Sequence, residues 1–185
     1  SGGSDTADYN FLKIENTTDD KSAGIFFAIG SNGEAAITAT EVVDGNTDIA
    51  FQNRGGGVRS EKLRLDSQGR LGVGVIPKAF HANNKDVIQG SSGYVILGRG
   101  TSSLNISQNF YYDSSDAGKY IATGAATVYN QSNGSHTFYN ASSGSADGSA
   151  SLVERFQIQS DGRVSIGAPA SNALGALHIH ANQGT

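Results

Sequence analysis

The sequence contains no cysteine, no methionine and no tryptophan, and only 2 prolines among its 185 residues. The lack of cysteine excludes disulfides and thiolate metal sites. The lack of methionine leaves no initiator residue, so we expect a processed product or an excised piece of a longer chain. Ser1-Gly2-Gly3-Ser4 is typical of a flexible lead or a cloning remnant. We therefore expect the fold to begin after residues 1–8.

The chain has little charge and no long apolar run. Its net charge is −4, and it has no basic stripe of the kind that phosphate binding needs, so nucleic acid is not an expected partner. No apolar run approaches the ~20 residues needed to span a bilayer. Glycine, at 25 of 185 residues, is nearly twice as frequent as the usual ~7 per cent. We infer many short strands joined by tight turns.

One stretch of sequence occurs twice. Residues 61–74 read E-K-L-R-L-D-S-Q-G-R-L-G-V-G, and residues 154–167 read E-R-F-Q-I-Q-S-D-G-R-V-S-I-G. The copies are about 93 residues apart and align without a gap, which indicates a repeated structural unit.

Each copy has the pattern of a β-hairpin. Apolar and polar residues alternate on both sides of a turn, so the apolar side chains share one face. Asp66 at the first turn position and Gly69 at the last favour a type I turn closed by a left-handed glycine, and Gly162 takes the same place in the second copy. A lone hairpin with one apolar face is marginally stable, so these faces must be covered, and we expect another chain to do so. The apolar residues are Leu63, Leu65, Leu71 and Val73 in the first hairpin and Phe156, Ile158, Val164 and Ile166 in the second.

This hairpin, followed by a proline-containing link and a Leu-His-Ile strand, resembles the repeat of bacteriophage tail-fibre shafts, which often precedes a self-cleaving intramolecular chaperone domain. The matching residues are 61–74 with Pro77, and 154–167 with Pro169 and Leu177-His178-Ile179; residues 11–30 and 47–57 also resemble the upstream half of the repeat. The resemblance implies an all-β, elongated homotrimeric fibre of tandem β-hairpin or β-sandwich-like units. It also implies a place in the virion, in the tail fibre, with other phage tail proteins as partners.

The alternation divides the chain into two β units, residues 9–84 and 85–185. A linker is expected at 76–84, around Pro77, and a surface loop at 141–150, which is almost all Ser, Gly, Ala and Asp. The predicted strands are 9–16, 25–30, 35–43, 47–53, 58–66 and 70–75 in the first unit, and 94–98, 104–112, 119–130, 135–140, 151–159, 163–167 and 175–181 in the second.

The function implied is structural: a segment of a trimeric phage tail fibre that carries or forms the end that binds a host cell-surface saccharide or outer-membrane receptor. Two alternatives stay open, a tailspike that depolymerises polysaccharide and the head of a bacterial trimeric adhesin. The sequence shows no catalytic constellation, and we expect neither an enzyme nor a cofactor. Asp113 and Asp116 could be drawn as glycosidase carboxylates, but a turn rich in Ser, Asp and Gly explains them more simply.

A run rich in tyrosine marks the part of the second unit that departs from the shaft-like pattern. Aromatic rings with a polar tip stack on sugar rings, so we hypothesise a shallow saccharide-binding surface at Tyr111, Tyr112 and Tyr120. The alternative is that these tyrosines pack between strands. Because Tyr111 and Tyr112 are adjacent, they are expected to point to opposite faces.

Two further patterns suggest metal sites. His178 and His180 share one side of a predicted strand, so three such pairs on a three-fold axis would offer six nitrogens to a transition metal. Alternatively both imidazoles face water, and we expect no metal. The Asp44–Asp48 segment begins like a calcium loop but has Ile49 and Gly55 where that loop needs Gly and Glu, so we expect an ordinary turn.

Overall fold

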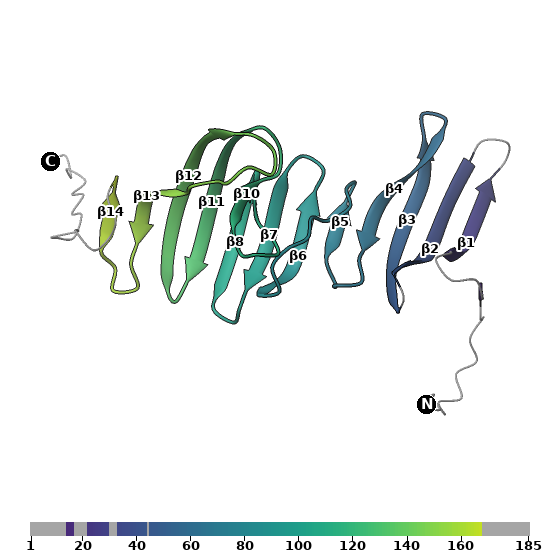
Figure 1. Cartoon of the computed structure of the whole chain (residues 1–185), viewed down its shortest axis with the longest axis horizontal. Coiled ribbons are helices and arrows are strands. Elements are labelled where there is room, and N and C mark those ends of the chain that lie inside the picture. The colour runs from purple at the N-terminus through teal and green to yellow at the C-terminus, as the bar shows by residue number, and fades with distance from the viewer. Residues whose placement is uncertain (1–13, 17–21, 30–32, 44, 168–185) are drawn as a thin grey trace, which may run out of the picture.

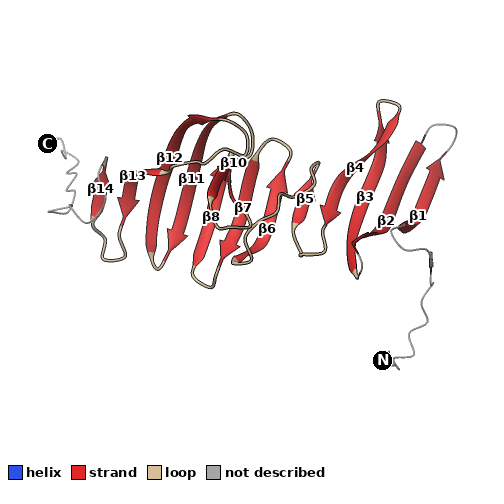
Figure 2. Cartoon of the chain, in the orientation of Figure 1, coloured by secondary structure: helices blue, strands red, loops and turns tan. Residues whose placement is uncertain are grey.

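A computed structural model describes residues 14–16, 22–29, 33–43 and 45–167 of the chain. Within these ranges the protein consists of strands and loops (Figure 2), which confirms the all-β prediction. The described part accordingly contains no helix that could cross a membrane. The strands are β1 Ser22–Ile29, β2 Gly33–Val43, β3 Asn46–Gly55, β4 Val58–Leu65, β5 Leu71–Val73, β6 Asn84–Gly90, β7 Tyr94–Arg99, β8 Ser103–Gln108, β9 Phe110–Tyr112, β10 Gly118–Tyr120, β11 Gly124–Ser132, β12 Ser135–Gly144, β13 Val153–Ile158 and β14 Val164–Ile166.

Twelve of these strands form a single sheet in the order β1-β2-β3-β4-β5-β6-β7-β8-β11-β12-β13-β14. Neighbouring strands are antiparallel except β5 and β6, which are parallel. The strands lie across the longest axis of the molecule, with β1 and β14 at opposite ends (Figure 1). At a spacing of ~4.8 Å between strands, the sheet is roughly 50 Å long. The sheet is continuous where the two units were predicted to meet, and the division into two domains stays a prediction.

Both repeated hairpins have the predicted turn. In the first, the backbone N–H of Gly69 donates to the carbonyl of Asp66 (2.9 Å), and in the second that of Gly162 donates to the carbonyl of Gln159 (2.9 Å). Gly69 has φ 77° and Gly162 has φ 85°, the left-handed conformation that glycine adopts readily. The prediction of a tight turn closed by a left-handed glycine is confirmed in both hairpins.

The repeat extends to a β-bulge. On β4 the register with β3 shifts at Lys62, and on β13 the register with β12 shifts at Arg155, the equivalent residue. The carbonyl of each bulged residue accepts a hydrogen bond from the last glycine of its motif, Gly74 (2.8 Å) or Gly167 (2.9 Å). Both copies thus share the bulge at their second residue and its hydrogen bond to their last glycine, which has positive φ in each copy.

On one face of the sheet, a row of apolar side chains crosses eleven strands, and in β2–β5 a second row lies beside it, made of Ile37, Phe51, Leu63 and Val73. Residues in the longer row are direct cross-strand partners, so their side chains lie side by side on the same face. Many of the row's large side chains are exposed, among them Ile106 and Phe138, each 44 per cent exposed. We call these residues the apolar row: Ala39, Ile49, Leu65, Leu71, Ile88, Ile96, Ile106, Tyr129, Phe138, Phe156 and Ile166.

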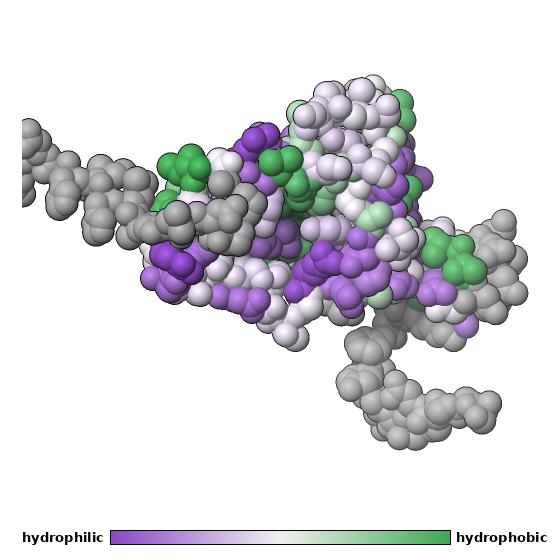
Figure 3. Space-filling model, turned by 60° about the vertical axis from the view of Figure 1, so that its left-hand side comes forward, coloured by the Kyte–Doolittle hydropathy of each residue, from purple (hydrophilic) through white to green (hydrophobic). Residues whose placement is uncertain are grey.

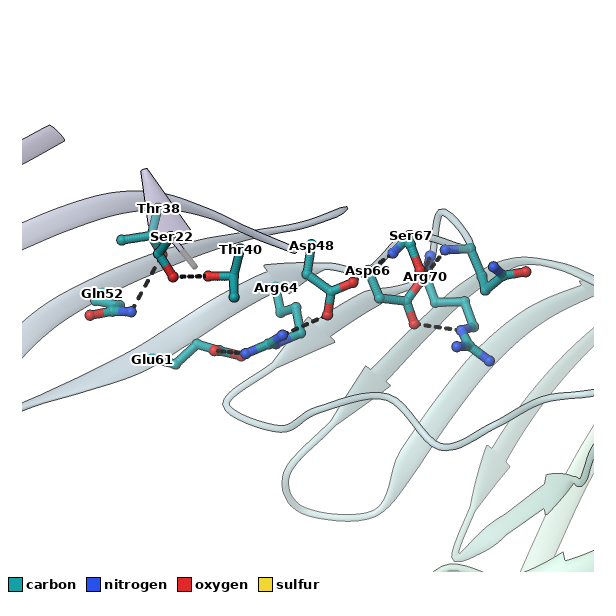
Figure 4. Close-up of polar contacts among 11 residues, drawn as sticks. Ser22, Thr38, Thr40, Asp48, Gln52, Glu61, Arg64, Asp66, Ser67 and Arg70 are labelled. Atoms are coloured by element: carbon teal, nitrogen blue, oxygen red, sulfur yellow. Dashed lines mark hydrogen bonds and ion pairs between the residues drawn. The ribbon is translucent and has the colours of Figure 1, made fainter. Parts of the chain in front are cut away.

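The opposite face is polar near the first hairpin (Figure 4). Arg64 pairs with Asp48 (2.6 Å) and with Glu61, and the other carboxylate oxygen of Asp48 accepts the backbone N–H of Ser67 (2.8 Å). Asp48 is buried, so its charge needs these partners. Asp48 thereby ties β3 to the turn that follows β4.

Over β6–β8, β11 and β12 the same face is covered by a second layer. This layer consists of β9, β10 and the segments around Phe80 and Ser149, which are joined to them by isolated bridges. Two buried clusters lie beneath it: one contains Phe80, Val87, Val95, Leu97 and Tyr111, and the other contains Phe110, Tyr120, Ala126, Val128 and Ala141. The core of the chain therefore lies on the side of the sheet opposite the apolar row.

Several strand predictions were wrong. Residues 84–90 form β6, although no strand was predicted there, and the predicted strand 104–112 is broken at Asn109, whose φ is 58°. The predicted loop 141–150 begins too early, because β12 continues through Gly144 and Ala141 is buried. Of the predicted strand 9–16, residues 14–16 are described and form no strand, and the predicted strand 175–181 lies outside the described residues.

The turn geometry yields a stability prediction. We expect Gly162→Val to lower the free energy of unfolding by more than ~1 kcal/mol, because a β-branched residue is strongly disfavoured at positive φ. The matched control is Gly55→Val: a Cβ meets nothing within 4 Å at either glycine, but Gly55 lacks the positive φ. Denaturant unfolding measures both variants, and equal losses would contradict the explanation from backbone strain.

Candidate functional site

Tyr111, the first of the three predicted saccharide-binding residues, is a core residue. It lies on β9, is only 6 per cent exposed, and packs edge-on against Phe80 with ring centroids 5.7 Å apart. Its hydroxyl donates to Oδ1 of Asp147 (2.7 Å). Burial, and then this hydrogen bond, raise the pKa of the Tyr111 hydroxyl.

Tyr120, on β10, is likewise buried, at 5 per cent exposed. Its ring covers Gly144 so closely that a Cβ there would come within 2.2 Å of a ring carbon, and its hydroxyl donates to the carbonyl of Ser142. Neither Tyr111 nor Tyr120 has a ring face free for stacking on a sugar. For these two residues the alternative interpretation, packing against the sheet, accounts for the structure.

Tyr112 is different, because it is only half-buried. It lies on the other side of β9 from Tyr111, as expected for adjacent strand residues, and contacts Phe110 edge-on at 4.9 Å. The guanidinium carbon of Arg99 lies 4.1 Å from the centre of its ring. Burial raises the pKa of the Tyr112 hydroxyl, and the neighbouring Arg99 opposes that rise.

A pocket of about 370 Å³ opens beside Tyr112, and we call it the Tyr112 pocket. Its polar and aromatic walls are Arg99 on β7, Ser103 and Asn105 on β8, Asn130 on β11, Tyr139 on β12 and Tyr112 itself. Val128 and Leu152 supply apolar surface. The pocket thus gathers side chains from five strands.

Of these wall residues, only Tyr112 is among the saccharide-binding residues predicted from the sequence. Asn105 and Asn130 are hydrogen-bonded to each other, with Nδ2 of Asn130 donating to Oδ1 of Asn105 (3.0 Å). They become neighbours because β8 and β11 pair although β9 and β10 separate them in the chain. That pairing has no local sequence signal, so the amide pair could not have been found from the sequence.

The two aspartates of the glycosidase alternative have separate partners. Asp113 accepts hydrogen bonds from the Ser115 hydroxyl (2.6 Å) and from the backbone N–H groups of Ser115 (2.9 Å) and Ala117 (3.0 Å). Led by the Ser115 hydroxyl, these bonds hold the pKa of Asp113 below its usual value, whereas a general acid needs a raised one. Asp116 forms an ion pair with Arg99. Asp113 is therefore held as a turn residue, in agreement with the simpler interpretation.

The described part of the chain contains no cluster of three or more His, Asp or Glu side chains that could hold a metal ion. His178 and His180 lie outside it, as does Asp44 of the calcium-like segment. The hypotheses about these residues stay predictions.

Comparison with known proteins adds no assignment: no protein-family model matches this sequence, and no curated protein matches it. The likeness to tail-fibre repeats therefore depends on the residues quoted above.

The loop between β12 and β13 is fixed to the covering layer through Asp147. Its carboxylate accepts hydrogen bonds from Nζ of Lys78 (2.8 Å) and from the Tyr111 hydroxyl (2.7 Å). These two contacts, that of Lys78 first, hold the pKa of Asp147 below its usual value. The ionised form of Asp147 is therefore the one that the folded chain favours.

This shift predicts a pH dependence. A carboxyl group whose pKa is depressed in the folded state stabilises the fold above its ordinary pKa of about 3.9, and that stabilisation is lost as the pH falls through the folded-state value. We expect wild type to be more stable than Asp147→Asn near about pH 6, and the difference to shrink below about pH 4. Thermal unfolding across this range measures it, with Lys78→Gln expected to reduce the same pH dependence. If the difference in stability between wild type and Asp147→Asn did not change with pH, the stabilising role of the ionised Asp147 would be contradicted.

Proposed function

We propose that this chain is a structural segment of a homotrimeric bacteriophage tail fibre, which carries or forms the end that binds a host receptor. The observation that carries the proposal is the apolar row, which runs the length of the sheet on the face that the covering layer leaves free. Hydrophobic residues do reach the surface in several places (Figure 3). A continuous apolar surface of this extent marks an interaction site.

The shape of this surface supports other copies of the chain as its occupants. The row follows the long axis of the sheet, so identical chains lying side by side would place the same side chains along a common axis. With a length of roughly 50 Å and a width of roughly 10 Å, the row alone offers about 500 Å² per chain, somewhat less than the ~800 Å² per partner of a standard interface. Each repeated hairpin contributes two residues to the row, Leu65 and Leu71 in the first and Phe156 and Ile166 in the second. The number three comes from the resemblance to tail-fibre repeats.

Mass in solution tests the assembly. We expect light scattering of the wild-type chain at micromolar concentration to give three times the mass of one chain. Ile106→Asp should shift the assembly toward monomer, because it would bury an unpaired carboxylate between chains at a cost of several kcal/mol. Because Ile106 is 44 per cent exposed in the single chain, the substitution should leave the chain folded.

Ile76→Asp is the matched control for that variant. Ile76 is also an exposed isoleucine, at 65 per cent, but it lies in the segment from Val75 to Pro77 that passes over Gly72, on the opposite face of the sheet. We expect this variant to retain the mass of wild type. A monomeric wild-type chain, or equal effects of the two variants, would refute the proposed assembly.

The two alternatives predict different results in other assays. A polysaccharide-depolymerising tailspike would release reducing sugar from capsule or lipopolysaccharide, and we expect no release. The head of a bacterial trimeric adhesin would also trimerise, so mass in solution does not distinguish it from a viral fibre. The identity of the neighbouring genes, viral or bacterial, distinguishes these two alternatives.

A further inference from the structure

We propose that the Tyr112 pocket is a binding site for a neutral saccharide of one or two sugar rings. The inference rests on the receptor-binding part of the proposed function and does not need the trimer. Tyr112, Tyr139 and the amide pair Asn105–Asn130 supply the contacts.

The walls of the pocket match the two surfaces of a sugar ring. A sugar presents an apolar face of C–H groups and a rim of hydroxyls that both donate and accept hydrogen bonds. The Tyr139 ring, together with the part of the Tyr112 ring that Arg99 leaves uncovered, offers flat apolar surface with polar tips, a combination suited to such a ligand. At about 370 Å³ the pocket lies at the small end of ligand sites, which limits the occupant to one or two rings.

The amide pair has hydrogen-bonding capacity left over. Asn130 donates to Asn105, which leaves the amide N–H groups of Asn105 and the amide oxygen of Asn130 without a side-chain partner among the described residues. Asn105 is only 4 per cent exposed, so its position is fixed by the sheet. A buried donor and a neighbouring acceptor can together bind a hydroxyl group, which is both acceptor and donor.

The charges around the pocket favour a neutral ligand. Arg99 is the charged residue of the lining, and its guanidinium is already paired with Asp116 and packed over the Tyr112 ring. An acidic sugar would have to compete with the Asp116 carboxylate for this cation. A neutral sugar can bind without breaking the ion pair.

The pocket is accessible on the proposed fibre. Asn105 and Val128 point to the covered side of the sheet, whereas the adjacent residues Ile106 and Tyr129 belong to the apolar row on the other side. Burying the row between chains would therefore turn the pocket outward, toward a receptor.

The test is a titration of the whole chain with a panel of neutral mono- and disaccharides, followed by NMR or calorimetry, with an acidic sugar for comparison. We expect at least one neutral sugar to bind. Asn130→Ala should weaken the binding of this sugar at least tenfold. The substitution removes the free amide oxygen of Asn130 and also the hydrogen bond by which Asn130 holds the Asn105 side chain. Tyr139→Leu, which keeps apolar bulk but removes the ring, should also weaken the binding.

Tyr111→Phe is the control, since Tyr111 lies on the opposite side of β9 and its hydroxyl contacts Asp147 instead of the pocket. We expect this variant to bind within twofold of wild type. Each variant is checked for a wild-type spectrum, so that loss of binding is not loss of fold. Binding to no sugar of the panel, unchanged affinity in Asn130→Ala, or preference for the acidic sugar would overturn the proposal. A monomeric chain that binds sugar would refute the fibre assembly and leave this site standing.

Discussion

The structure depends on the register of its strands. Side chains alternate between the two faces of a strand, so a shift of one residue at any pair would move every later side chain to the wrong face. The register instead aligns one apolar residue per strand from Ala39 on β2 to Ile166 on β14. It does so across the parallel pair β5–β6, and the row lies on the turn side of the bulges at Lys62 and Arg155. The exposed apolar face and the covered core on the other face both follow from this alignment.

Much of the fold could be predicted where the pattern is local. Alternation and turn chemistry located the hairpins at 61–74 and 154–167, including the positive φ at Gly69 and Gly162. β6 was missed because its apolar residues do not alternate with polar ones: Val87 is buried in the core, and its neighbour Ile88 lies on the other face, in the apolar row. β9 was joined to β8 because only the backbone angle of Asn109 separates them. The Tyr112 pocket depends on the pairing of β8 with β11, which no local pattern reveals.

The two repeats keep the same backbone but differ in their polar face. In the first, Arg64 neutralises Glu61 and Asp48; in the second, the residue equivalent to Arg64 is Gln157. Buried oxygens of Glu154, Gln157 and Ser165 have no hydrogen-bond partner among the described residues. Buried polar groups are normally hydrogen-bonded. Among the described residues, the hydrogen bonding of the second hairpin is therefore less complete than that of the first.

Because the strands lie across the long axis, the length of the molecule and its width can change independently. Each added strand lengthens the sheet by ~4.8 Å, whereas residues inserted at a strand end or a turn project sideways. The chain between β8 and β11 illustrates this: β9 and β10 are inserted there, yet β8 and β11 remain neighbours in the sheet. Such insertions can create or reshape a pocket on the outer side while the spacing of everything along the axis, including the apolar row, stays the same.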